Sequence, residues 1–236
     1  MVQAPKASMP EIEYPDSDGK PMADNTLQFQ WIVTIKENCE QVFADNPQVF
    51  VTGDLLWYPV EGNNKLCQAP DTMIVFGRPK GYRGSYQQWK EDNIPPQVVV
   101  EILSPGNRLK EMAKKFAFYQ TYGVEEYYLY DPDRNDLTGW IRRNSVFVPI
   151  EELEQWISPR LQVRFSLAEA ALTMFYPDGE RFLTFSELAD RARQATQRAH
   201  QEAERADQEA QRADQEAQRV EQLMAQLRAL GVEPEV

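Results

Sequence analysis

The chain has 236 residues, of which 42% are hydrophobic and 26% charged, and its formal net charge is -12. This length is enough for one sizeable hydrophobic core and an additional segment, and the composition is typical of a soluble globular protein. The negative charge argues against a broad electrostatic grip on nucleic acid. It leaves room for a local basic groove or for a divalent cation that offsets phosphate charge.

The rare residues exclude several kinds of chemistry. His200 is the only histidine, which disfavours a Ser-His-Asp triad, a Cys-His nucleophile and an HExxH zinc site. A reactive site would have to consist of carboxylates, lysine and backbone groups, and such oxygen ligands suit hard cations such as Mg²⁺ and Mn²⁺. Cys39 and Cys67 lie far apart in the sequence, which favours a reduced, cytoplasmic protein, while one disulfide between them stays open.

No segment is typical of a membrane protein or of a secreted one. No apolar run reaches the length of a membrane span, and the polar N-terminal stretch lacks the apolar core of a signal peptide. We therefore expect no membrane partner. Residues 1–23 contain several prolines and show no periodicity, so we expect them to form a flexible lead-in.

A helix and three strands are predicted next. The stretch Asp24-Asn25-Thr26 is typical of a helix cap. The helix that follows, to about Ala44, carries apolar residues at helical spacing, namely Leu27, Trp31, Ile35, Cys39, Val42 and Phe43. Residues 48–52 and 55–60 predict short strands, and residues 66–76 predict a third that is broken at Pro70. We expect these strands to form a β-meander.

Residues 77–96 predict a long connection, and long loops in compact domains are often functional. Basic and aromatic residues alternate along it: Arg78, Lys80, Arg83 and Lys90 with Tyr82, Tyr86 and Trp89. Two interpretations stay open at this point. The loop could contact the backbone and bases of a nucleic acid, or it could be an ordinary surface loop with buried aromatic rings.

The most informative stretch is a buried strand that carries one acid. Residues 98–103 form a nearly continuous apolar run, which is typical of a strand covered on both faces. Glu101 interrupts this run, and a carboxylate in such a strand is costly unless it is paired or bound to a metal. Asp71 is a second acid on a predicted strand. These two acids are the main candidates for a functional site.

A strand–helix–strand unit is predicted after Glu101. Residues 108–122 have the apolar spacing of a helix, with Lys110, Lys114 and Lys115 on neighbouring faces, and Gly123 is a natural C-cap. Residues 125–132 predict the next strand, so the pair of strands is expected to be parallel. Further on, the sequence predicts a hairpin over 136–149, an edge segment near Trp156, Pro159, Leu161 and Phe165, and a turn over 176–180.

Residues 186–236 are predicted to form a long helical tail. From Arg198 to Gln218 the chain repeats a seven-residue unit, in which alanines alternate four and three residues apart, at Ala199, Ala203, Ala206, Ala210, Ala213 and Ala217. This is a heptad seam, and Leu223, Met224, Leu227 and Leu230 continue it. Two interpretations stay open: a dimerising coiled coil, or a solvated single helix held by Glu–Arg pairs.

The middle of the chain resembles a bacterial family of restriction-endonuclease-like proteins with the PD-(D/E)XK nuclease fold. The resemblance covers roughly residues 24–185. It is carried by Pro70-Asp71, by Val99-Val100-Glu101-Ile102-Leu103-Ser104-Pro105, by Lys115 and Tyr119, and by Gly123-Val124, Glu126-Tyr127-Tyr128 and Asp131-Pro132. It implies an α/β fold with a central mixed β-sheet flanked by helices, to which the long C-terminal helix is added.

The resemblance also implies a metal site. Asp71 and Glu101 would bind Mg²⁺, with Mn²⁺ as a possible substitute, because this fold brings acids from different strands together at a cation. The fold usually places a lysine two residues after the second acid, where this chain has Leu103. Lys115 from the following helix is the expected replacement, although Lys114 beside it stays open.

The resemblance leaves further acids open. Members of this fold often add an acid from the first helix, for which Glu37 and Glu40 are the candidates. Asp54 and Glu61, which precede Asp71, are also possible members of the acidic pocket.

Three functions are compatible with the sequence. The first is a metal-dependent endonuclease that hydrolyses DNA phosphodiester bonds with Asp71, Glu101 and Lys115 as catalytic residues. The second is a catalytically inactive nuclease fold that acts in binding or assembly through its helical tail. The third is a structural protein in which Glu101 is merely paired with a lysine. A homodimer through the domain or the C-terminal helix is expected, because the fold usually needs two sites to cut a duplex.

Overall fold

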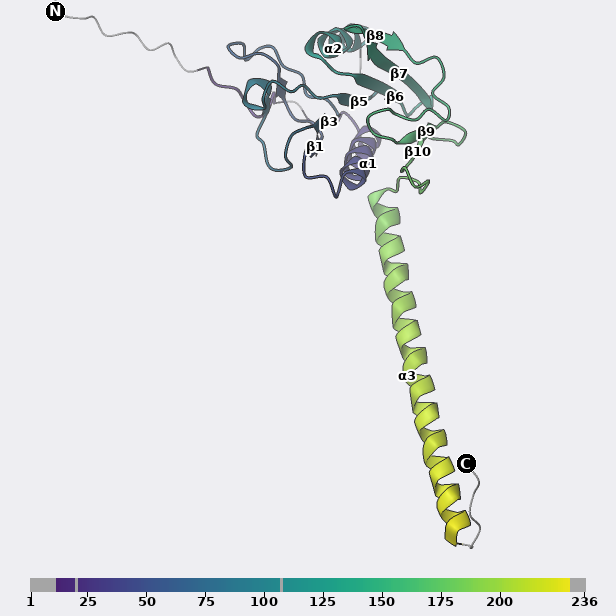
Figure 1. Ribbon diagram of the computed structural model, residues 1–236. Helices are drawn as coiled ribbons and strands as arrows, with labels where there is room; N and C mark the ends of the chain where they lie inside the picture. The colour runs from purple at the N-terminus through teal and green to yellow at the C-terminus, as the bar shows by residue number, and fades with distance from the viewer. Residues whose placement is uncertain (1–11, 20, 107, 230–236) are drawn as a thin grey trace, which may run out of the picture. The chain divides into compact units, whose positions relative to one another are not determined.

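The structure is a computed structural model, and it describes residues 12–19, 21–106 and 108–229 (Figure 1). The chain divides into two compact units after Thr184. Within the described residues, no helix is both long and apolar enough to cross a membrane.

The first unit is built on a six-stranded mixed sheet with the strand order β1-β3-β5-β6-β7-β8. The neighbours β5 and β6 run parallel, and helix α2 connects them, while the other neighbouring pairs in this sheet are antiparallel. The predicted mixed α/β fold and the strand–helix–strand unit are therefore confirmed. The elements of the sheet and of this connection are β1 (Val49–Thr52), β3 (Thr72–Phe76), β5 (Val98–Ile102), α2 (Leu109–Tyr122), β6 (Glu126–Asp131), β7 (Asp136–Arg143) and β8 (Val146–Pro149).

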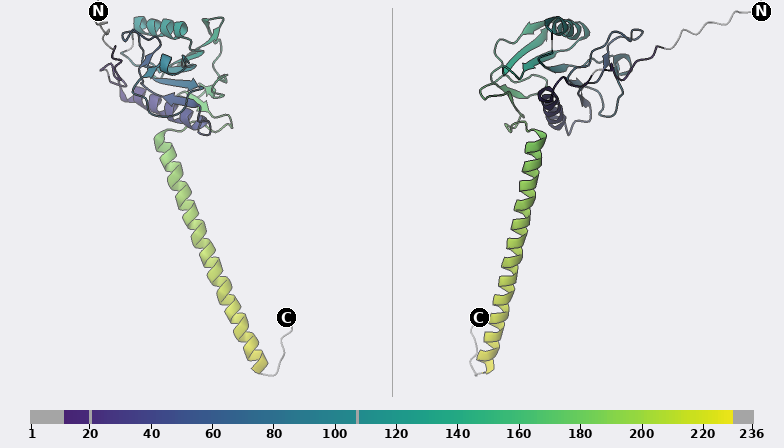
Figure 2. Two further views of the ribbon diagram at one scale, coloured as in Figure 1. Left: turned by 60° about the vertical axis from the view of Figure 1, so that its left-hand side comes forward. Right: turned by 180° about the vertical axis from the view of Figure 1, so that it is seen from behind.

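Two helices cover the two faces of this sheet. Helix α1 (Thr26–Val42) lies on one face and α2 on the other (Figure 2). Successive side chains of a strand point to opposite faces, so β5 contributes Val98, Val100 and Ile102 to the core that contains α1 and contributes Val99 to the core that contains Phe118 and Tyr119 of α2. By the same alternation Glu101 points to α2.

The ends of both helices follow from local sequence. Asn25 caps α1, because its side-chain oxygen accepts a hydrogen bond from the backbone N–H of Gln28 at 2.8 Å. Helix α2 ends at Gly123, whose φ of 99° lies in the left-handed region that favours glycine. This C-cap turns the chain directly into β6 and so fixes the spacing between α2 and the sheet.

The predicted meander is only partly correct. Strand β2 (Trp57–Tyr58) leaves the main sheet and pairs in parallel with β4 (Tyr86–Gln87), and residues 66–71 do not form a strand. The chain turns after β1 at Asp54, which has a φ of 49° and donates its N–H to the carbonyl of Pro70. Because proline has no N–H to donate, the antiparallel ladder with β1 starts only after Pro70.

The remaining elements complete the first unit. The predicted hairpin is confirmed, since β7 and β8 pair antiparallel. A short helical turn over Gln88–Lys90 follows β4, and β9 (Arg164–Ser166) pairs with β10 (Thr173–Phe175) in a separate small sheet. Leu161 and Phe165 are buried in the core that contains α1, as the predicted edge segment requires.

The second unit contains helix α3 (Phe185–Ala229), which has no buried residue within its described length. If Ala203 and Ala210 take heptad position a, acids occupy positions e and g, which flank the seam of positions a and d. In a parallel, in-register pair of such helices, like charges would face each other: Glu202 opposite Asp207, Glu209 opposite Asp214, and Glu216 opposite Glu221. This pattern weakens self-pairing, and a homodimer through α3 stays a prediction.

Replacement of Gly123 by alanine tests the turn between α2 and β6. A Cβ atom there would lie 3.0 Å from Cγ of Pro95 and would have to adopt a positive φ. We expect Gly123→Ala to lower the free energy of unfolding by about 2 kcal/mol, measured by urea unfolding. Gly62→Ala is the matched control, because Gly62 also has a positive φ but open space around its Cβ position. Equal losses in both variants would contradict the role of the Pro95 contact.

Candidate active site

Asp71 lies just before β3 and is buried, with 6% of its surface exposed. Its Oδ2 accepts a hydrogen bond from the backbone N–H of Ile102 at 2.7 Å and lies 3.5 Å from Nε2 of Gln28. Burial raises the pKa of Asp71 to about 8, and the nearby Glu101 carboxylate adds to this rise. A cation at this place would therefore favour the ionised form of Asp71.

Glu101 is the buried acid of β5, with 2% of its surface exposed, and two side chains of α2 bind it. Nζ of Lys115 lies 2.6 Å from Oε2, and the hydroxyl of Tyr119 donates to Oε1. Lys115 and Tyr119 lie one helical turn apart, so they point to the same side of α2. The Tyr119 ring stacks on Trp57, which holds the hydroxyl in place.

Lys115 is the lysine that points inward. Burial lowers the pKa of Lys115, but the charges of Glu101 and Asp71 outweigh this effect and raise the pKa above its usual value. The side chain is therefore positively charged at neutral pH. Lys114 is exposed at the rim of the same pocket. The structure thus brings Asp71, Glu101 and Lys115 together, while their catalytic role stays a prediction.

The contribution of the first helix is Gln28, which sequence reasoning missed. Its Nε2 donates to the carbonyl of Ile102 at 3.0 Å and faces Asp71. Glu37 and Glu40, the predicted candidates, instead form ion pairs with Lys36 and, for Glu40, also with Lys80. The sequence did contain an indication of this role. Gln28 lies on the same helix face as the apolar residues Ile32, Ile35 and Cys39, and a polar side chain on a buried face is expected to have a hydrogen-bond partner.

A pocket of about 710 Å³ opens onto Asp71, Gln28 and Lys115, whereas Glu101, which Lys115 binds, does not border it. It is bordered by residues of the N-terminal segment, of α1, of the turn before β3 and of α2, namely Asp18, Pro21, Met22, Ala23, Asp24, Gln28, Asp54, Gln68, Ala69, Asp71, Gly106, Arg108, Glu111, Met112, Lys114 and Lys115. Asp54 is half-buried there, and burial, followed by the charge of Asp18, raises its pKa. Glu61 lies in an exposed turn and does not border the pocket.

The donor atoms fit a hard cation. Asp71 and Glu101 supply carboxylate oxygens, and the carbonyl of Ile102 adds a neutral one. In the described part of the chain, no group of three or more His, Cys, Asp and Glu side chains is placed to hold a metal ion. Mg²⁺ is usually bound by one or two carboxylates, with water and substrate phosphate completing its shell, so two acids are sufficient for this ion.

The N-terminal segment forms one wall of the pocket. We term residues 12–19 and 21–24 the strap. The Tyr14 ring packs between Tyr58 and Trp89, at centroid distances of 5.2 and 4.8 Å, and the Tyr58 hydroxyl donates to the carbonyl of Pro15 at 2.8 Å. Part of the predicted flexible lead-in therefore packs against the domain, whereas residues 1–11 and 20 lie outside the described residues.

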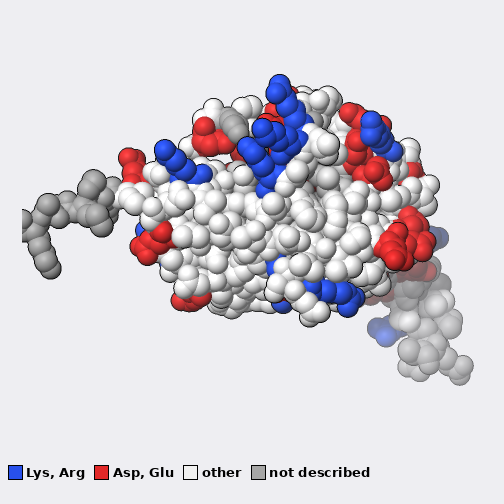
Figure 3. All heavy atoms as spheres, turned by 90° about the horizontal axis from the view of Figure 1, so that it is seen from above, with Lys and Arg blue, Asp and Glu red and all other residues white. Residues whose placement is uncertain are grey.

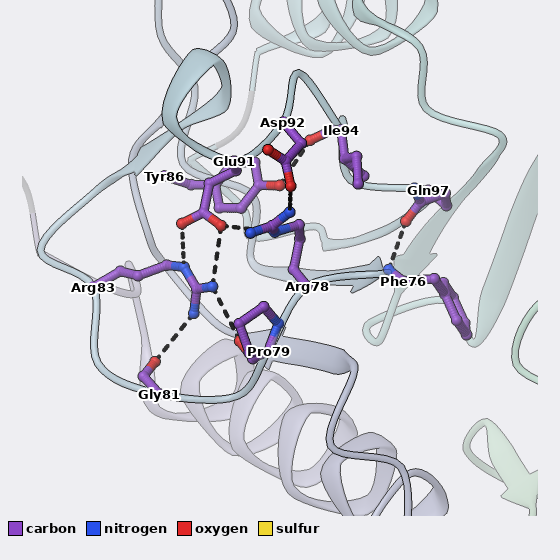
Figure 4. A network of polar contacts seen from close by, with 10 residues as sticks. All are labelled: Phe76, Arg78, Pro79, Gly81, Arg83, Tyr86, Glu91, Asp92, Ile94 and Gln97. Atoms are coloured by element: carbon purple, nitrogen blue, oxygen red, sulfur yellow. Dashed lines mark hydrogen bonds and ion pairs between the residues drawn. The ribbon is translucent and has the colours of Figure 1, made fainter.

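No residue of the loop 77–96 borders this pocket. Arg78 and Arg83 both bind Glu91, at 2.9 and 2.6 Å, and the arginines also contact Asp92 and backbone carbonyls of the loop (Figure 4). Asp71 precedes β3 and Gly77 follows it, so the start of the loop and Asp71 lie at opposite ends of a five-residue strand, about 17 Å apart. This arrangement favours the interpretation as a surface loop.

A third buried acid, Glu126, has a different environment. It lies at the start of β6, and its carboxylate accepts hydrogen bonds from the hydroxyls of Tyr128 and Ser158 and from the N–H of Arg160. Burial raises its pKa, although these donors oppose the rise. Because no lysine reaches Glu126 in the described residues, it acts as a structural link between β6 and the segment around Ser158.

Basic groups gather at one place on the face that carries α2, with acidic groups to either side (Figure 3). Helix α2 contributes the exposed Lys110 and Lys114 to its surface. The net negative charge of the chain therefore does not prevent a local basic surface next to Lys115.

The mixed sheet with helices on both faces and the two buried acids at the neighbouring strands β3 and β5 defines a restriction-endonuclease-like α/β protein. Residues 9–172 match the family model described as "Uma2: Putative restriction endonuclease". This match spans more than half of the chain, so the protein belongs to that family, and the predicted resemblance is confirmed.

Among solved structures, the chain is similar to a "putative nuclease belonging to DUF820" from Anabaena variabilis ATCC 29413. The two share 15% sequence identity over 64% of this chain and 85% of the other, with a TM-score of 0.48. No curated protein matches the chain.

The raised pKa of Asp71 predicts a pH dependence of stability. A carboxyl group with a folded pKa of about 8 and an ordinary unfolded pKa binds a proton more tightly in the folded state. The contribution of this group to the free energy of unfolding is complete below pH 4 and is lost as the pH rises to about 8. We expect the wild type to lose up to ~1.4 kcal/mol per pH unit in this window relative to Asp71→Asn, measured by urea unfolding. If the free energies of unfolding of the two proteins changed in parallel with pH, the raised pKa of Asp71 would be contradicted.

Removal of one hydroxyl tests how Glu101 is held. We expect Tyr119→Phe to lower the free energy of unfolding by about 2 kcal/mol, because a buried carboxylate loses a donor while the ring keeps its stacking on Trp57. Tyr122→Phe is the matched control on the same helix, since its ring also contacts Trp57. We expect this control to change stability by less than about 0.5 kcal/mol. An equal effect of both substitutions would rule out a special role of the Tyr119 hydroxyl.

Proposed function

We propose that the protein is a metal-dependent endonuclease that hydrolyses DNA phosphodiester bonds, with Mg²⁺ as its cofactor and Mn²⁺ as a substitute. The observation that carries the proposal is the cluster of Asp71, Glu101 and Lys115, in which Lys115 binds Glu101 at 2.6 Å, the charge of Glu101 acts on Asp71, and Asp71 and Lys115 border one pocket. Membership in a family described as a restriction endonuclease family supports it.

Asp71, Glu101 and the carbonyl of Ile102 would hold the ion. When bound, the ion supplies a water molecule of lowered pKa and stabilises charge on the phosphate. Gln28 and the N–H of Ile102 orient Asp71, while Lys115 and Tyr119 orient Glu101. Burial of both acids excludes bulk water from them and strengthens their interaction with any positive charge in the pocket.

Lys115 replaces the lysine that the strand lacks. Leu103 holds that strand position, and its N–H donates to the carbonyl of Tyr130 to extend the ladder between β5 and β6. Lys115 reaches Glu101 from α2 and also borders the pocket. Its protonated Nζ would therefore lie where it can bind a phosphate oxygen and offset the charge that develops during hydrolysis.

A second candidate function is a catalytically inactive nuclease fold that acts in binding or assembly. Both oxygens of Glu101 already have donors, and α3 exposes apolar side chains, among them Val220, Leu223 and Leu227. This function would require neither a metal nor Lys115. A cytoplasmic location and a homodimer stay predictions under both functions.

A cleavage assay with matched lysine variants distinguishes the two functions. With plasmid DNA and millimolar Mg²⁺, we expect Lys115→Ala to reduce kcat by about 100-fold or more. Lys110→Ala should cleave like the wild type, because Lys110 is exposed on α2 and does not border the pocket. Asp71→Ala should abolish cleavage. Equal activity of the Lys115 and Lys110 variants would remove Lys115 from the site. Absence of cleavage both in the wild type and in Tyr14→Ser, in which the strap loses its aromatic anchor, would favour the inactive module.

A further inference from the structure

The strap meets the candidate active site at two places. Asp18, Pro21 and Met22 border the pocket, and Asp24 borders it where α1 begins. Ser104, which follows β5, donates its hydroxyl to Asp24 at 2.5 Å. At its other end the strap is held by Tyr14, by the bond from Tyr58 to Pro15 and by the bond from Asn64 to the carbonyl of Glu13 at 2.8 Å.

The strap places negative charge at the entrance to Lys115. Asp18 and Asp24 border the pocket together with Lys115, and Asp16 lies against Gly84 further along the strap. A phosphodiester that approached Lys115 through this pocket would pass Asp18 and Asp24. Because like charges repel, the closed strap opposes the entry of a polyanion.

The strap also fixes the orientation of Gln28. The N–H of Asp24 donates to Oε1 of Gln28 at 2.8 Å, so the amide group of Gln28 turns its Nε2 towards the carbonyl of Ile102. That carbonyl is one of the three oxygen donors that the proposed cation would use. With the strap closed, the donor is occupied by Gln28.

The attachment of the strap is local. Its described residues form no helix and no strand, and its bonds to the domain between Glu13 and Pro15 come from side chains and from one N–H, that of Gly62 to the Tyr14 hydroxyl. Segments with few buried contacts open at a small fraction of the free energy of global unfolding. The strap can therefore leave the pocket while the sheet and both helices stay folded.

We propose that the strap is an autoinhibitory cover of this site, which keeps an anionic nucleic acid backbone from Lys115 and holds Gln28 on the carbonyl of Ile102 until it is displaced. The inference rests on the proposed function for the identity of the excluded ligand. It assigns the strap, residues 12–19 and 21–24, a regulatory part in the reaction, and none of these residues is a catalytic residue.

The test separates opening of the strap from cleavage. Tyr14→Ser removes the aromatic anchor, Asp18→Asn removes one charge at the pocket, and the control Glu151→Gln removes one exposed charge that does not border it. Hydrogen exchange reports whether the strap opens in each protein. Fluorescence anisotropy with a labelled single-stranded DNA oligonucleotide in EDTA reports affinity without cleavage.

We expect Tyr14→Ser to speed hydrogen exchange in residues 13–19 and to bind the oligonucleotide about tenfold more tightly than the wild type, since a repulsive charge pattern is removed. Asp18→Asn should raise affinity without faster exchange, and Glu151→Gln should change neither. Faster exchange in Tyr14→Ser with unchanged affinity would overturn the proposal, as would unchanged affinity in Asp18→Asn. If affinity rises as expected but no protein cleaves DNA with Mg²⁺, the strap stands as a cover and the proposed endonuclease function fails.

Discussion

The site depends on one buried carboxylate that must be neutralised. Glu101 lies in the central parallel strand pair, where an unpaired charge would be costly. Helix α2 supplies the partners of this charge, since Lys115 and Tyr119 lie on consecutive turns and each binds one oxygen of Glu101. The packing of α2 on the sheet, the stacking of Tyr119 on Trp57 and the sharp turn at Gly123 all serve to keep these two donors in register with β5.

The binding of Glu101 by Lys115 and Tyr119 also determines the charge balance of the site. Asp71 lies close enough to Glu101 to be affected by its charge, yet its hydrogen-bond donors among the described residues are the backbone N–H of Ile102 and the amide of Gln28, neither of which is charged. One lysine thus serves two buried acids, and the pair carries an excess of negative charge whenever Asp71 is ionised. Such a pair attracts a cation. Glu126, which is equally buried, is bound by hydroxyls and a backbone N–H and keeps a structural role, while the neighbouring Glu125 binds the guanidinium of Arg160.

Much of this arrangement could be predicted from the sequence, and the reasons are local. The apolar run around Glu101 and the helical spacing after it predict β5, α2 and their parallel connection to β6, and an acid in an apolar strand stands out. Gln28, the strap and the detour of β2 could not be predicted in the same way. Gln28 acts through a carbonyl 74 residues away in the chain, and Tyr14 is held by rings that reach it only after folding. Such contacts depend on tertiary packing, which periodicity does not encode.

The most direct test of the account is whether a cation binds at Glu101. Thermal unfolding of the wild type and of Glu101→Gln would be measured with EDTA and with millimolar Mn²⁺ or Mg²⁺, each with and without a DNA oligonucleotide. A ligand that binds only the folded state raises its stability by mass action, so the account predicts a higher unfolding temperature for the wild type with metal and no such rise for Glu101→Gln. An equal rise in both proteins, or none in the wild type under any of these conditions, would contradict a metal site built on Glu101.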